Sequence, residues 1–281
     1  MNWDSLILHY EIHIRLGFFF AVFVPMALWE MAAPRRALGI SKRLRWINNL
    51  GMVFLNSLIL RLLFPAAAAG MAALAAARGW GLLNYFELPF WLAAAVSVIA
   101  MDCVIYLQHV LVHHADPDYD VATGARFHPL EIILSMLIKF ATIMVLGPPL
   151  VAVMIFEVLL NATAMLNHSN VKIPLATDRV LRWFLVTPDM HRVHHSVEDD
   201  EANSNFGFNL PWWDRLFGSY RDQPRGGHQG MVIGIHGYRD PRQVNRLPGM
   251  LLLPFAGKIS GYCAINRRQW SRPEGEGDKR P

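Results

Sequence analysis

The sequence has little cysteine and little charge. Only two of its 281 residues are cysteines, which excludes a disulfide framework and a zinc site built from paired thiolates. Charged residues make up 17% and hydrophobic residues 53%, so the composition is not that of a disordered chain. The formal net charge of +4 is small and dispersed, unlike the concentrated basic patch of a nucleic-acid-binding protein. Any metal ion must therefore be held by histidine and carboxylate side chains.

Several common enzyme motifs are also missing. The chain has no Gly-x-x-x-x-Gly-Lys or Gly-x-Gly-x-x-Gly loop for a nucleotide, no Gly-x-Ser-x-Gly nucleophile and no His-Glu-x-x-His zinc-protease helix. It has no Cys-x-x-Cys-His haem attachment and no set of iron–sulfur cysteines. If the chain catalyses a redox reaction, its electrons must come from a separate donor.

What the sequence has in abundance is long apolar segments. They cover residues 16–33, 47–77, 88–112 and 132–166, each interrupted by only one or two charges. Pro65 and Gly70 interrupt the second segment, which we predict to be one bent membrane span. Gly147-Pro148-Pro149 interrupts the fourth, which we predict to be a short hairpin that enters and leaves the membrane on one side. The sequence therefore predicts an all-α, multi-pass integral membrane bundle over residues 16–170.

The distribution of charge predicts which end of the bundle carries the polar part. The loop 34–46 holds five basic residues and no acid, which favours the cytoplasmic side. Counting the crossings from this loop places every histidine from 109 onward on the same side. We therefore predict a single domain over residues 1–281, with a cytoplasmic, helical, metal-binding cap at 171–240. A tail with a disordered end follows at 241–281.

Seven of the twelve histidines fall into three groups along the chain. They are His109, His113 and His114; His168; and His191, His194 and His195. In the third group, spacings of three and four place two imidazoles on one helical face with the third beside them. Such a group can bridge two metal ions. On residue type alone, His168 could equally be a ligand or a structural histidine, and we expect solvated or hydrogen-bonded roles for His9, His13, His228 and His236.

A second pattern includes the first histidine group. Asp102, Tyr106, His109 and His113 are separated by four, three and four residues, which would place them on one stripe of a helix. A carboxylate inside an apolar span is costly unless it is paired. We therefore predict that Asp102 accepts an imidazole N–H and fixes the tautomer of a ligand. Histidines at a membrane surface with few carboxylates favour a dinuclear iron oxygenase that acts on lipid.

These residues resemble the fatty acid hydroxylase and sterol desaturase family. The matching strings are 102–109 (DCVIYLQH), 112–131 (VHHADPDYDVATGARFHPLE), 167–171 (NHSNV), 187–196 (TPDMHRVHHS) and 203–220 (NSNFGFNLPWWDRLFGSY). The resemblance spans about residues 15–240. It implies a membrane enzyme that holds two irons, takes dioxygen and electrons from a ferredoxin- or cytochrome-like donor, and hydroxylates or desaturates a fatty acyl or sterol-like lipid.

The resemblance also implies roles for particular residues. The metal ligands would be His109, His113, His114, His168, His191, His194 and His195. His128 also matches a family position and would support them, and we predict the same supporting role for Asp102, Tyr106 and Asp189. The aromatic segment 205–220 is predicted to pack the catalytic cap onto the membrane.

One departure from the family pattern leaves alternatives open. Family members usually separate a first histidine box from a second by about a dozen residues, whereas here Gln108-His109-Val110-Leu111 runs directly into the box that contains His113. Two expected imidazoles are missing, so the chain could bind one metal ion, bind two weakly, or be an impaired or inactive membrane scaffold of the same family. A third hypothesis is a metal-dependent membrane hydrolase with Asp189 or Glu198 as its base.

Overall fold

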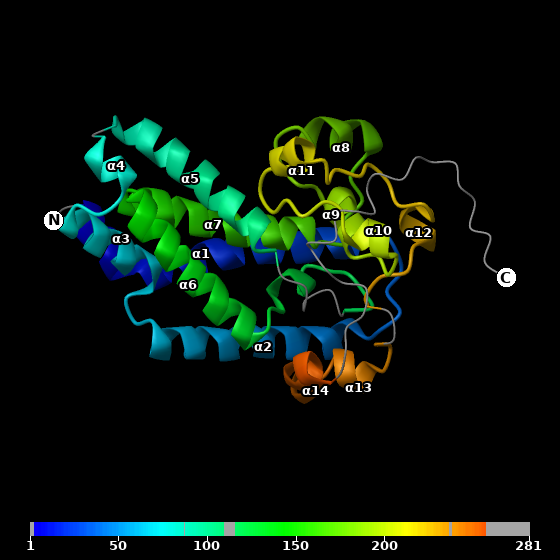
Figure 1. Ribbon diagram of the computed structural model, residues 1–281. Helices are drawn as coiled ribbons and strands as arrows, with labels where there is room; N and C mark the ends of the chain where they lie inside the picture. Colours follow the sequence, from blue (N-terminus) through cyan, green and yellow to red (C-terminus); the bar gives the residue numbers. More distant parts are fainter. Residues whose placement is uncertain (1–2, 87, 110–115, 236–237, 257–281) are drawn as a thin grey trace.

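The structure is a computed structural model that describes residues 3–86, 88–109, 116–235 and 238–256 (Figure 1). Within these ranges all regular structure is helical, and pairing of β type is limited to two isolated bridges, Pro34 with Val171 and Ser196 with Ile233. The predicted all-α class is confirmed.

Among the described residues, five segments are long and apolar enough to cross a membrane. They are α1 (Trp3–Ala32); α2 (Lys42–Leu63) with α3 (Ala67–Arg78) and the short α4 (Leu82–Tyr85); α5 (Phe90–Leu107); α6 (Pro129–Leu146); and α7 (Leu150–Asn167). An 18-residue helix is about 27 Å long, close to the thickness of a bilayer's hydrocarbon core. These segments confirm the predicted multi-pass membrane protein.

The interior of the bundle is built around α7, which packs against α1, α3 and α5. One face of α3 consists of fully buried alanines, and small side chains let this helix lie close to its neighbours. Large apolar side chains point outward from the bundle, and Phe54 on α2 is 73% exposed. An apolar exterior of this kind suits contact with lipid rather than water.

The two predicted breaks occur where proline and glycine stand. Pro65 lies between α2 and α3, and these helices belong to one candidate span. Gly147 ends α6 with a left-handed φ of +67°, and a Cβ there would meet the carbonyl oxygen of Trp80 at 2.5 Å. A left-handed turn in so tight a place requires glycine. The chain turns back here as predicted. The hairpin is not short, however, because α6 and α7 have 18 residues each and each is a candidate membrane span by itself.

The ends of α1, α5 and α7 and the starts of α2 and α6 meet at one end of the bundle, where the cap lies (Figure 1). The basic loop reaches this cap directly. The Arg35 guanidinium pairs with Asp189 at 2.9 Å, and Arg36 donates to the carbonyl oxygen of Met231 at 3.1 Å. The loop and the cap therefore lie on the same side, and the cytoplasmic assignment of that side stays a prediction.

The cap is made of short helices joined by loops. They are α8 (Leu175–Leu181), α9 (Pro188–His194), α10 (Asp199–Ala202), α11 (Trp212–Phe217) and α12 (Gly227–Gly230), together with the 3-10 turn η2 (Thr123–Ala125). The start of the predicted tail is folded as well, as α13 (Pro241–Val244), α14 (Leu247–Leu252) and η3 (Leu253–Phe255). Val244, Met250 and Leu253 are buried there. The predicted disordered end lies outside the described residues.

The third apolar segment differs from its prediction at its C-terminal end. The stripe that includes Asp102 and Tyr106 requires a helix that continues through His109, but α5 ends at Leu107. The side chain of His109 instead meets the cap, with its Nε2 2.8 Å from that of His194. Because the backbone is no longer helical at His109, the imidazole of this residue can reach α9 of the cap.

Candidate metal centre

Five of the seven predicted ligands lie together in one buried cluster where the bundle meets the cap. His109 follows α5, His168 follows α7, and the other three, His191, His194 and His195, come from α9 and its C-terminal cap. Four of the five are fully buried, and His109 is nearly so. The packing of two membrane helices against one short cap helix brings these distant parts of the sequence together.

The cluster contains a triad and a pair. In the triad, ring nitrogens of His168, His191 and His195 all lie within 4.8 Å of one another, the spacing of ligands around one metal ion. The Nε2 atoms of His168 and His191 are 3.2 Å apart. In the pair, the Nε2 atoms of His109 and His194 are 2.8 Å apart. Ring nitrogens that converge in this way are arranged as the ligands of a shared cation are.

The triad and the pair are neighbours. The ring centroids of His191 and His194 are 5.5 Å apart, and those of His109 and His191 are 5.8 Å apart. Two metal positions could therefore lie side by side. The division into triad and pair follows the sequence spacing. His191 and His195, which are four residues apart, belong to the triad, and the side chain of His194 points toward the pair.

Local sequence explains where α9 begins. The side-chain oxygen of Thr187 accepts from the backbone N–H of Met190 at 3.3 Å, and Pro188 occupies the first helical position. Both features favour a helix start. They fix the position of α9 along the chain and so the directions in which its two imidazoles, at 191 and 194, project.

His168 is held in a defined orientation. Its Nδ1 lies 2.8 Å from the carbonyl oxygen of Ala164 and 2.6 Å from Oδ1 of Asn167. Both partners are acceptors, so Nδ1 carries the hydrogen and Nε2, which has none, is the ring nitrogen that faces the triad. The close approach of η2 to this ring requires Gly124, because a Cβ there would lie 2.9 Å from Nδ1.

The electrostatics of the cluster suit a metal site. Burial lowers the pKa of His109 to about 4, that of His168 to about 3, and that of His194 well below its ordinary value. These imidazoles are neutral at pH 7, as metal ligands must be. A buried set of neutral imidazoles fits iron, for which imidazole is a suitable ligand.

Comparison with known proteins shows which family the segment around this site matches. Residues 94–219, which include all five clustered histidines, match the family model described as fatty acid hydroxylase. This segment belongs to the fatty acid hydroxylase family.

Two curated relatives align with part of the chain. The ornithine lipid hydroxylase OlsE of Rhizobium tropici is 31% identical over 129 residues, which cover 46% of this chain and 37% of that protein. The alkylglycerol monooxygenase of Xenopus tropicalis is 30% identical over 112 residues, 38% of this chain and 23% of that protein. The aligned part thus spans less than half the length of either relative. No solved structure matches the chain.

Behind the clustered histidines of the fatty acid hydroxylase segment lies an aromatic support that is not apparent from the sequence. The Tyr119 ring stacks on His168 with centroids 5.7 Å apart and meets His195 edge-on at 5.0 Å. Its hydroxyl donates to the carbonyl oxygen of Asn167 at 2.6 Å, and the Arg192 guanidinium lies 4.9 Å from the ring centroid. Burial raises the pKa of Tyr119, which keeps this hydroxyl protonated as a donor.

A buried group of charges joins the segment 116–126 to α2, and the sequence does not reveal it either. The Arg45 guanidinium is completely buried, 2.7 Å from Asp116 and 2.5 Å from Asp120, and it donates to Thr123 as well. Arg126 pairs with Asp116 at 3.2 Å. The two guanidinium groups hold the pKa of Asp116 far below its ordinary value. The group fixes η2, which in turn supports the triad.

Asp102, predicted to support a ligand, binds the cap instead. Its carboxylate accepts from the indole N–H of Trp213 at 2.9 Å and from the backbone N–H groups of Asn209 and Leu210 at 3.2 Å. In the fatty acid hydroxylase segment, these contacts hold the aromatic residues of the cap against α5. This role differs from the predicted contact of Asp102 with an imidazole.

Tyr106, one turn later on α5, also binds the cap. Its hydroxyl lies 2.7 Å from Oγ of Ser219. Its ring stacks on Phe217 with centroids 5.4 Å apart and meets Phe206 edge-on at 6.2 Å. Tyr106 therefore supports the cluster through the packing of the cap, which contains three of the five histidines.

His128, the third predicted supporting residue, lies at the start of α6. Its Nδ1 accepts from the backbone N–H of Leu130 at 3.1 Å, and its own backbone N–H donates to the Glu131 carboxylate at 2.7 Å. Because Nδ1 is an acceptor, Nε2 carries the hydrogen and donates to the carbonyl oxygen of Leu251 at 3.2 Å. His128 thus caps one helix and joins it to α14, apart from the cluster.

Asp189, the fourth, is held by cations. Its carboxylate binds Arg35 and Arg192, and its Oδ2 lies 3.5 Å from Nε2 of His228. These groups hold the pKa of Asp189 below its ordinary value. A carboxylate engaged in this way is a poor general base, which weighs against the hydrolase hypothesis.

The remaining histidines lie apart from the cluster or outside the residues that the structure describes. Those outside the described residues are His113, His114 and His236. His9 and His13 on α1 are exposed, as expected of solvated side chains. His228 is buried beside Asp189, so it is not solvated.

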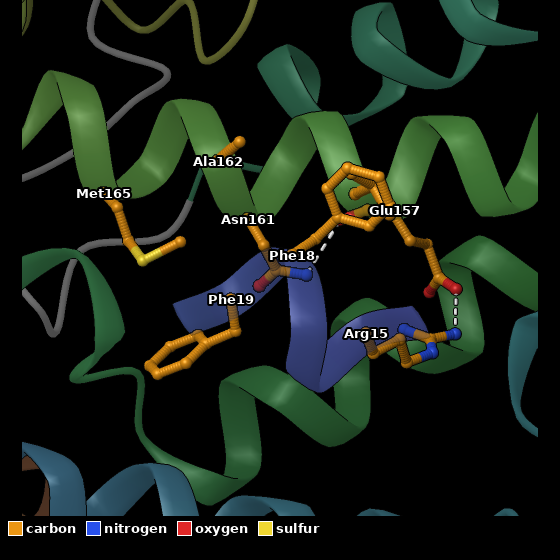
Figure 2. A pocket seen from close by; sticks show the side chains of 8 residues that line it. Arg15, Phe18, Phe19, Glu157, Asn161, Ala162 and Met165 are labelled. Atoms are coloured by element: carbon orange, nitrogen blue, oxygen red, sulfur yellow. Dashed lines mark hydrogen bonds and ion pairs between the residues drawn. The ribbon is translucent and has the colours of Figure 1, made fainter. Parts of the chain in front are cut away.

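A small hollow lies between α1 and α7, apart from the histidine cluster (Figure 2). Phe18 and Phe19 form part of its apolar lining, and Arg15 and Glu157 pair at one end. Lys139 of α6 also pairs with Glu157, at 2.8 Å. Charged groups inside a membrane bundle are tolerated when paired in this way.

Proposed function

We propose that this protein is a membrane-bound di-iron oxygenase that hydroxylates a C–H bond of a lipid. The observation that carries the proposal is the cluster of five buried imidazoles at the junction of bundle and cap, divided into a triad and a pair. The family of the surrounding segment and the names of two of its relatives support the same class of activity.

The residues divide the work as follows. His168, His191 and His195 would hold one iron. His109 and His194 would contribute to a second, for which the histidines at 113 and 114 remain candidate ligands from the sequence. Bound iron would supply the activation of dioxygen. The reaction places one oxygen atom in the product and releases the other as water, so it consumes two electrons and two protons from an external donor.

The chain's own side chains would exclude water and position the lipid. The rings of Phe206 and Phe208 lie against the cluster, with centroids 5.1 Å from His194 and 5.9 Å from His109, respectively. An apolar wall of this kind limits the access of water to a reactive site. His109 and His168 lie just beyond the ends of α5 and α7, so we expect the lipid to approach the cluster from the bilayer at this level.

Two other hypotheses stay open to the same test. The impaired scaffold is favoured by the compressed histidine boxes, and desaturation would use the same ligands as hydroxylation. Desaturation would remove two hydrogen atoms from the lipid and add no oxygen.

The experiment is a product analysis with purified protein, a chemical or enzymatic electron supply and oxygen-18 dioxygen. Ornithine-containing lipids and alkylglycerols form the first substrate panel, chosen from the names of the two relatives. We expect a product that carries one oxygen-18 atom. A double bond without label would identify a desaturase, and a cleaved lipid whose new oxygen is unlabelled, because it comes from water, would identify a hydrolase. No product from any lipid by an iron-loaded chain would favour the scaffold.

A pair of histidine variants makes the test specific to the cluster. His191→Ala removes a triad ligand and is expected to abolish the labelled product. His13→Ala changes an exposed histidine on α1 and is expected to leave it unchanged. Equal product from both variants would contradict the proposed site.

A further inference from the structure

One side of the cap exposes large apolar side chains that no described residue covers. They lie on α8 and the residues after it and on α11: Val180, Trp183, Phe184, Trp212, Leu216 and Phe217. Phe184 is 65% exposed and Leu216 is 69% exposed. We call this set the cap platform. A patch of this kind on a protein marks a surface that binds another molecule or a membrane.

The platform is a single, ordered surface. The indole N–H of Trp212 donates to the carbonyl oxygen of Trp183 at 2.7 Å. The Arg215 guanidinium lies 4.3 Å from the centroid of the Trp183 ring and donates to the carbonyl oxygen of Arg182 at 3.2 Å. Two segments whose tryptophans are 29 residues apart in the sequence thus present their apolar side chains together.

The platform lies next to the point where α5 ends (Figure 1). Trp213 of α11 donates to Asp102 in the last turns of α5, and the Phe217 ring stacks on Tyr106 with centroids 5.4 Å apart. The last residue of α5, Leu107, is itself 63% exposed. The platform therefore continues the apolar, lipid-facing exterior of a membrane span.

The accessible charges of the platform helices are basic. Asp178 of α8 and Asp214 of α11 are both buried, whereas Arg179 is exposed and Arg215 is half-buried. On another part of the cap, the accessible charges of α10 are acidic, since Asp199 is exposed and Asp200 is half-buried. Anionic lipid headgroups attract the first surface and repel the second.

We propose that the cap platform inserts into the headgroup region of the bilayer and docks the cap on the membrane. Tryptophan together with arginine at the edge of a membrane-spanning bundle is the composition of such an interfacial anchor. The platform holds the end of α5, and with it His109, at a fixed depth.

The test is a depth measurement by spin labelling in vesicles that contain anionic phospholipid. Single cysteines replace Phe184 and Leu216, in a chain whose two native cysteines are replaced by alanine. Phe54→Cys, on the exposed face of α2, is the reference inside the hydrocarbon core, and Asp199→Cys, on α10, is the reference in water. Collision with oxygen reports the apolar phase, and collision with a water-soluble nickel chelate reports the aqueous phase.

We expect both platform labels to collide with oxygen several-fold more, relative to nickel, than the label at 199, and to lie less deep than the label at 54. A ratio equal to that at 199 would overturn the proposal, because the platform would then face water. Labels shielded from both reagents would also overturn it, because a second copy or another protein would then cover the surface. The measurement needs no enzymatic activity, so its outcome is independent of the proposed oxygenase.

Discussion

The bundle and the cap distribute polar and apolar residues in opposite ways. On α1, of 30 residues only four are buried, and two of these are Glu11 and Glu30. On α9 every residue is buried, and the buried set includes Asp189, Arg192 and two histidines. The bundle exposes its apolar side chains to lipid, whereas the cap encloses a polar interior.

This difference shows where each region obtains its stability and its chemistry. In lipid, helices form because their backbone groups must be satisfied within the segment. The cap must instead satisfy buried charges and imidazoles through particular pairs, because an unpaired buried charge is costly. Single substitutions should therefore act strongly on the cap and more weakly on the outer face of the bundle.

The largest expected effect is that of Arg45→Ala. The change leaves Asp116 and Asp120 buried without their shared cation, and we expect a loss of about 3 to 5 kcal/mol in the free energy of unfolding. Chemical unfolding in detergent measures it. Arg43→Ala, an exposed arginine two residues earlier, is the control and should cost less than about 0.5 kcal/mol. Equal losses would refute a stabilising role for the buried charges.

A somewhat smaller effect is expected inside the bundle, from Glu157→Gln. The carboxylate pairs with Arg15 (Figure 2) and Lys139, so its loss leaves Lys139 without a partner. We expect the free energy of unfolding to fall by about 3 kcal/mol. The loss is limited because Arg15 still pairs with Glu11. The double variant Glu157→Met with Lys139→Met should recover more than half of the loss. A double variant that is less stable than the single one would contradict this reasoning.

Asp102→Asn tests how the cap is docked on the bundle. The amide cannot accept from three N–H groups as the carboxylate does, and we expect a loss of about 2 kcal/mol. Hydrogen exchange of residues 209–213 should speed up by roughly tenfold or more. Iron content should be retained. Loss of iron with unchanged exchange would instead support the predicted role of Asp102 as the partner of a metal ligand.

An effect of similar size to that of Asp102→Asn depends on pH and concerns His228. Burial lowers the pKa of this histidine to about 3, while the unfolded chain takes up the proton near its ordinary pKa of about 6.5. Between these values the unfolded state binds more protons, so stability falls as the pH falls. Between about pH 8 and pH 5 the parent chain should lose about 2 kcal/mol more than His228→Gln. Parallel pH profiles of unfolding for the two chains would contradict the prediction.

Local patterns in the sequence are sufficient to predict the bundle. Length and hydropathy locate the spans, and Pro65 and Gly147-Pro148-Pro149 locate the bend and the hairpin. The spacing within the third histidine group predicts how its members divide on one helix. The same spacing of four between His9 and His13 leads to no cluster, because both side chains are exposed.

The supports of the site depend on contacts between distant residues. Arg45 lies 71 residues from Asp116 in the sequence, and Tyr119 reaches the backbone of Asn167 48 residues later. Among the basic residues of the loop, Arg35 and Arg45 pair with carboxylates on the cap side. A count of charges along the chain cannot distinguish these paired arginines from solvated ones, so their partners become visible only in the fold.

The most direct test of the histidine cluster as a dinuclear metal centre is the iron content of the purified chain, measured beside His191→Ala and His13→Ala. We expect about two irons in the parent chain and in His13→Ala, with most of the metal lost from His191→Ala. Equal iron in all three chains, or no stoichiometric iron in the parent after loading, would contradict the assignment.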